Sequence, residues 1–143
     1  MIPKPRQALS DLALKLMLSV APQTRSNYAA SNTGMIAMLL QCLAQDFDRA
    51  ADVRSLDIAE MSALFHALPA GVDRPLAGRI ERFLASHPKS LRIADLDAHH
   101  AEATRLLIEL HAWSEAHGDA ALERSIWEYL TRHAERHAYD MPV

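Results

Sequence analysis

The chain has 143 residues, a formal net charge of −3 and one cysteine, Cys42. This length fits a single domain, so we expect one helical domain over residues 1–143. The acidic balance provides no basic face for nucleic acid, and one cysteine excludes an internal disulfide and a zinc site of paired cysteines. No apolar run approaches the roughly 20 residues of a membrane helix, so we expect a cytoplasmic protein with neither nucleic acid nor membrane as a partner.

The first expected helix, residues 9–20, is apolar around most of its circumference. Its apolar side chains recur at helical spacing and also occupy the neighbouring positions: Leu9, Leu12, Leu14, Leu16, Met17, Leu18 and Val20. A helix of this kind is either central in a core or shared with another subunit. Ala21-Pro22 ends it, because proline disfavours a helical conformation in the preceding residue.

The second expected helix is long and covers about residues 26–54. Ser26 or Asn27 can cap it, and a bend is expected near Gly34. One apolar row with alternating steps of four and three predicts a seam against neighbouring helices: Ile36, Leu40, Leu43, Phe47 and Ala50. A second row lies beside it: Met35, Met38, Leu39 and Cys42. We therefore expect this helix to be covered from two directions.

The remaining chain also follows helical spacing. Asp57 with Glu60 matches a capping box, which predicts a new helix at residue 57 and a helical hairpin turn at 55–57. A short helix is expected from Arg74, a second long helix over about 91–117, and a last helix after the turn Gly118-Asp119. The tail from about residue 140 is expected to be irregular.

No segment alternates apolar and polar residues as a half-buried strand does. The sequence therefore predicts an all-α bundle of five or six helices, mostly antiparallel, with two long helices at about 26–54 and 91–117.

The histidines near the C-terminus suggest a metal site. His133 and His137 lie one helical turn apart, and His111 with Glu115 has the same spacing. This spacing partly resembles that of hemerythrin-like proteins, a resemblance that implies a di-iron centre inside a bundle. The chain lacks the final His-x4-Asp of that pattern.

Antiparallel pairing about Gly118 makes other histidines better partners for His133 and His137. It brings residue 137 to the level of residues 96–100, so His99 and His100 are the expected cross-helix ligands. This set would bind a divalent transition metal. The competing interpretation is that these histidines lie on a solvated face or at the frayed end of a helix.

Small polar residues at the start of the long helix suggest a contact or a ligand pocket. Tyr28, Asn32 and Gly34 belong to a stretch that is unfavourable in an ordinary helix, because Gly and Asn have low helix propensity. Such residues are typical of close helix packing or of a pocket for a small apolar ligand.

The charged end of the long helix is a candidate polar contact with a partner protein. Asp48, Arg49 and Asp52 lie within about one turn of one another, which also suits a solvated, ion-paired face. Met35, Met38 and Cys42 could offer sulfur ligands, but core filling explains them more simply. Residues 57–86 do not form a convincing DNA-reading pair of helices, because the second helix lacks a basic face.

Nucleotide-binding, hydrolase and calcium-binding motifs are absent, which disfavours catalysis without excluding it. The sequence therefore favours a non-catalytic helical protein that acts through contacts with a protein partner or as a homo-oligomer, with no cofactor. The alternative is a histidine-rich metal-binding bundle, with or without redox activity, that uses the four histidines His99, His100, His133 and His137.

Overall fold

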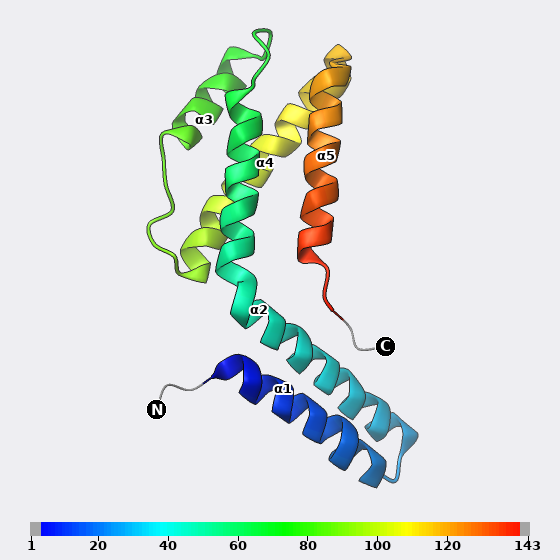
Figure 1. Cartoon of the computed structure of the whole chain (residues 1–143). Helices are drawn as coiled ribbons and strands as arrows, with labels where there is room; N and C mark the ends of the chain where they lie inside the picture. Colours follow the sequence, from blue (N-terminus) through cyan, green and yellow to red (C-terminus); the bar gives the residue numbers. More distant parts are fainter. Residues whose placement is uncertain (1–3, 141–143) are drawn as a thin grey trace. The chain divides into compact units, whose positions relative to one another are not determined.

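The computed structural model describes residues 4–140, and these residues are helical or irregular, without strands (Figure 1). The helices are α1 (Pro5–Lys15), α2 (Asn27–His66), α3 (Arg74–Leu84), α4 (Ile93–His117) and α5 (Ala120–His137). A π-helical turn, Leu16–Val20, and a 3₁₀ turn, Ala21–Gln23, continue α1. The prediction of an all-α fold is confirmed, and no described helix is long and apolar enough to cross a membrane.

The chain divides into two compact units, and α2 contributes to both. Unit 1 comprises Met1–Ala50 and Tyr139–Val143, and unit 2 comprises Ala51–Ala138. The single domain expected from the sequence stays a prediction. The predicted irregular tail begins within the described residues, at 138–140, and its remainder lies outside them.

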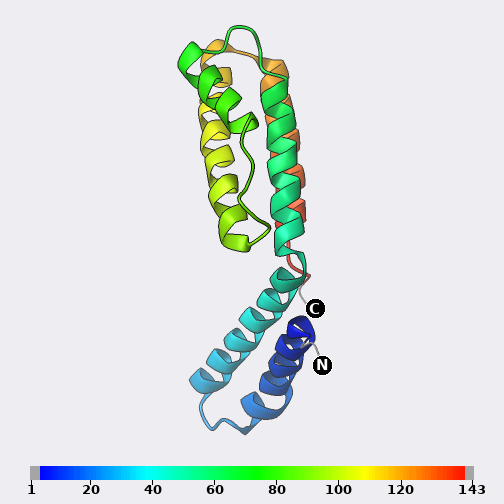
Figure 2. The ribbon, with the colours of Figure 1, turned by 90° about the vertical axis from the view of Figure 1, so that its left-hand side faces the viewer.

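Unit 1 is a helical hairpin in which α1 runs antiparallel beside the first part of α2 (Figures 1 and 2). Arg6 of α1 donates to the Asp48 carboxylate at 2.5 Å, near the open end of the hairpin. Among residues 4–50 and 139–140, only Ala13, Ala37 and Ala44 are buried. The apolar row predicted to be a covered seam is largely exposed instead, because these alanines form the seam between the two helices.

Unit 2 has a conventional hydrophobic core. Each of its helices contributes apolar side chains at steps of three and four: Met61, Phe65, Leu76, Ile80, Phe83, Ala103, Leu106, Leu107, Leu110, Leu122, Ile126 and Tyr129. Gly118 ends α4 with φ 65°, and the Asp119 carboxylate accepts a hydrogen bond from the Leu122 amide at the start of α5. The predicted turn at Gly118-Asp119 is therefore confirmed.

The helical hairpin predicted at residues 55–57 is wrong, because α2 continues to His66. Neither Gly nor Pro interrupts this stretch, and the Ser55 hydroxyl donates to the Ala51 carbonyl one turn earlier, which is compatible with a continuous helix. Asp57 does not act as a cap. Its carboxylate contacts α4 and α5 instead.

Candidate metal centre

Four polar side chains in unit 2 occupy positions where its helices otherwise carry apolar residues. On α2, Asp57 falls in a row of four-residue steps with Val53, Met61 and Phe65, all of them buried. On α4, His100 follows Leu96 by four residues and precedes Ala103 by three. Inward positions on three helices therefore bring polar groups to one place.

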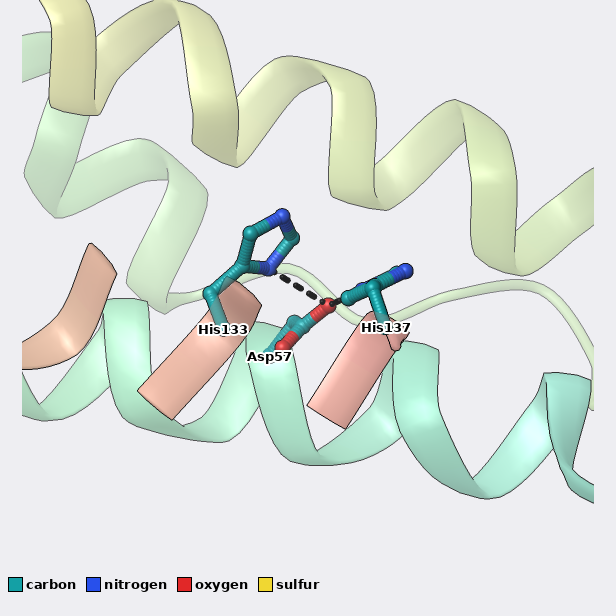
Figure 3. A group of neighbouring side chains, drawn as sticks. All are labelled: Asp57, His133 and His137. Carbon is teal, nitrogen blue, oxygen red and sulfur yellow. Dashed lines mark hydrogen bonds and ion pairs between the residues drawn. The ribbon is translucent and has the colours of Figure 1, made fainter. Parts of the chain in front are cut away.

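The last helix supplies two histidines in the same way. Its buried row Leu122, Ile126 and Tyr129 continues at residues 133 and 137. The rings of His133 and His137 lie one turn apart, with centroids separated by 4.2 Å. Figure 3 shows both rings beside the carboxylate of Asp57.

Three imidazoles meet one carboxylate oxygen. The Oδ2 atom of Asp57 lies 2.7 Å from Nε2 of His137, 3.1 Å from Nδ1 of His133 and 3.3 Å from Nε2 of His100. Asp57 is fully buried, with 0% of its surface exposed, whereas the histidines are partly exposed. A solvated face, the alternative interpretation of these histidines, does not describe this arrangement.

The hydrogen bonding of the cluster is incomplete. Asp57 Oδ2 is hydrogen-bonded to His137, but the facing nitrogens of His100 and His133 are buried without a hydrogen-bond partner. Buried polar atoms in native proteins nearly always have a partner, so each exception calls for a chemical explanation. A cation bound between these nitrogens and the carboxylate would provide one.

The spacing of the donor atoms fits a metal ion. The candidate ligand atoms of Asp57, His133 and His137 all lie within 4.8 Å of one another. His100 is not a member of this group, and it joins the site through its 3.3 Å distance to the same carboxylate oxygen. Two ligands bound at about 2.0–2.2 Å with tetrahedral angles are about 3.4 Å apart. The distances from Asp57 to His100 and His133 are close to this value, and the His137 ring has to withdraw by less than about 1 Å.

The protonation states also suit a ligand set. Burial lowers the pKa of His100, which favours the neutral imidazole that binds metals. Burial alone would raise the pKa of Asp57, but its interactions with His137 and His133 outweigh burial and lower it. The carboxylate is therefore ionised over the neutral range.

A second layer of charges orients the carboxylate. Arg136 donates to Oδ1 of Asp57 and, at 2.5 Å, to Glu60, which also accepts from Arg132 at 3.1 Å. Arg136 thus occupies one carboxylate oxygen and leaves Oδ2 for the histidines. Such outer partners fix the orientation of metal ligands.

The structure separates the other predicted metal candidates from this cluster. The ring of His99 stacks on Phe83 at 4.5 Å, so His100 is the partner that α4 supplies. His111 lies 3.8 Å from Glu115 on its own helix and makes an edge contact with Trp127. Sequence reasoning missed Asp57 as a site residue because it was interpreted as a helix cap. Its position in an apolar row was the available signal.

The remaining site candidates lie on α2 and do not join the cluster. Tyr28 is exposed, and a Cβ at Gly34 would meet nothing within 4 Å, so no neighbouring backbone packs closely there. Asp48 pairs with Arg6, and Arg49 lies over the ring of Tyr139 at 5.3 Å. Asn32 is partly buried and Asp52 is exposed.

Searches of protein families, curated proteins and solved structures found no match to this chain.

Proposed function

We propose that this protein binds a divalent transition-metal ion through Asp57, His100, His133 and His137. The observation that carries the proposal is the meeting of three imidazole nitrogens at one oxygen of a buried carboxylate. All three facing nitrogens lie within ion-pair distance of Oδ2 of Asp57. Ion pairing alone still leaves the facing nitrogens of His100 and His133 buried without a hydrogen bond, which a bound cation would explain.

The donor set restricts the metal. Three imidazoles and one carboxylate, without a thiolate, suit zinc, iron(II), cobalt(II) or nickel(II) better than copper(I). The partial exposure of His133 and His137 gives the ion a path from solution. Because the ligands come from α2, α4 and α5, a bound ion would tie three helices together and stabilise unit 2.

Metal analysis of protein purified without a histidine tag tests this proposal. The tag-free chain is expected to carry close to one equivalent of a single transition metal, or to take up one equivalent of cobalt(II) with visible absorption after chelator treatment. His133→Ala and His137→Ala should lose that equivalent. His87→Ala, which changes an exposed histidine outside the cluster, should keep it. Less than a tenth of an equivalent in both experiments would exclude the proposal.

A second candidate function is the protein–protein contact that the sequence favoured. The supporting observation is the set of large apolar side chains exposed on unit 1. Metal binding and such a contact are compatible, because their residues belong to different units.

A further inference from the structure

Unit 1 has almost no core of its own. Its buried residues within the described chain are three alanines, whereas its large apolar side chains lie outside the seam between α1 and α2. Burial of large apolar side chains is the main source of stability, and a pair of helices joined through alanines has little of it. The hairpin therefore lacks the buried surface that normally supports such a structure.

The exposed part of α2 also lacks charge. Residues 26–45 contain no Asp, Glu, Lys, Arg or His. A helix that faces water normally carries charged and polar residues on its solvent side. An uncharged helical stretch of this length with half-exposed methionine, isoleucine and leucine side chains indicates that another surface covers it.

One flank of the hairpin is continuously apolar. On α2, Ile36 and Leu43 each precede a buried alanine of the seam by one residue, as Leu12 does on α1. In antiparallel helices, equivalent positions beside the seam lie on the same side of the pair. We call this side the leucine flank, and it comprises Leu12, Leu16, Ile36, Leu40, Leu43 and Phe47.

The leucine flank is open to solvent. Leu12, Ile36, Leu43 and Phe47 are between 51% and 63% exposed. On the opposite flank, Leu14 and Met38 are also 57% and 42% exposed. Near the end of this part of α2, Gln45 and Asp46 bind Asp140 and Tyr139.

We infer that the leucine flank pairs with the same flank of a second copy of this chain. Two such hairpins form a four-helix bundle whose core consists of the flank residues of both copies. A twofold axis places the same patch of both copies in contact, and an uncharged flank approaches its copy without electrostatic repulsion. A partner selected by charge would have nothing to recognise on the flank, because none of its six residues is charged.

The available area agrees with a stable dimer. The α1 segment of the hairpin, Pro5 to Gln23, is about 30 Å long, and two adjacent helices are about 20 Å wide. The resulting footprint of roughly 600 Å² per chain, or about 1,200 Å² for the pair, reaches the lower limit of the roughly 1,200–2,000 Å² that specific interfaces bury.

Light scattering coupled to size-exclusion chromatography tests the pairing in the full chain. The wild type is expected to have twice the mass of the 15.9 kDa chain across micromolar concentrations. Leu43→Glu should shift the mass to that of one chain. Met38→Glu, which adds the same charge on the opposite flank of the same helix at a 42% exposed position, should remain dimeric.

If circular dichroism shows that Leu43→Glu reduces the helix content, cross-linking tests the pairing without that substitution. In a Cys42→Ser background, Leu43→Cys should be cross-linked between chains by a short bis-maleimide, and Met38→Cys should not. A wild-type monomer, a dimer unaffected by Leu43→Glu, or equal cross-linking from both cysteine positions would overturn the inference. A monomer in which the leucine flank is protected from solvent would instead show that another part of the same chain covers this flank.

Discussion

Removal of one histidine ligand should abolish most of the stabilisation that metal gives to unit 2. A ligand that binds only the folded state stabilises it by about 2.7 kcal/mol when its free concentration is 100 times Kd. Even outer-layer substitutions weaken metal binding by 10–100-fold, so His133→Ala, which removes a direct ligand, should weaken it by at least about 100-fold. At the same metal concentration the stabilisation then falls to about 0.4 kcal/mol.

Urea denaturation with and without a chelator measures this difference. Trp113 and Trp127 both belong to unit 2, so their fluorescence can report its unfolding. With a slope of about 2 kcal/mol per molar urea, the metal should raise the wild-type midpoint by about 1.4 M and that of His133→Ala by about 0.2 M. His87→Ala controls for weak binding to exposed histidines and should behave like the wild type. An equal metal effect in His133→Ala and the wild type would refute the assigned ligand set.

Three further predictions concern the fold. Leu110→Ala should destabilise unit 2 by about 3 kcal/mol in urea denaturation, because this fully buried side chain leaves a cavity in the core; a loss below about 1 kcal/mol would contradict its core position. Gly118→Ala should cost about 1 kcal/mol, since its φ of 65° is unfavourable for a residue with a Cβ; unchanged stability would contradict the left-handed turn. Arg79 donates a hydrogen bond to Glu109 and lowers the pKa of that exposed carboxyl. The pair therefore stabilises the folded state at pH values above the ordinary pKa of Glu109, and this stabilisation is lost as the pH falls through the lowered pKa. Arg79→Gln should raise the Glu109 pKa toward its ordinary value in an NMR titration, and an unchanged pKa would exclude this cause.

Local spacing predicts most of the helices but not their continuity. The rows around Leu107 and Ile126, and the turn at Gly118, follow from helical periodicity and from the conformational freedom of glycine. α2 continues through Asp57, whose carboxylate contacts α4 and α5, and a local capping pattern does not contain these contacts. A capping box predicts a helix start only where the Asp carboxylate has no better partner.

The sequence predicts part of the site, because helical spacing and a glycine turn are local features. The spacing of His133 and His137 and the turn at Gly118 placed these histidines near residues 99 and 100. The rotation of α4 then selects His100 and directs His99 toward Phe83. Only the three-dimensional arrangement adds Asp57, although a lone carboxylate in a row of buried apolar residues was a usable signal.

X-ray absorption at the edge of the bound metal, combined with anomalous diffraction from crystals of the metal-loaded chain, can locate the ion and identify its ligands. We predict one ion per chain, located between α2, α4 and α5, with imidazole nitrogens of His100, His133 and His137 and one oxygen of Asp57 at about 2.0–2.2 Å. An ion bound elsewhere, or a loaded protein whose anomalous map shows no peak beside Asp57, would contradict this account.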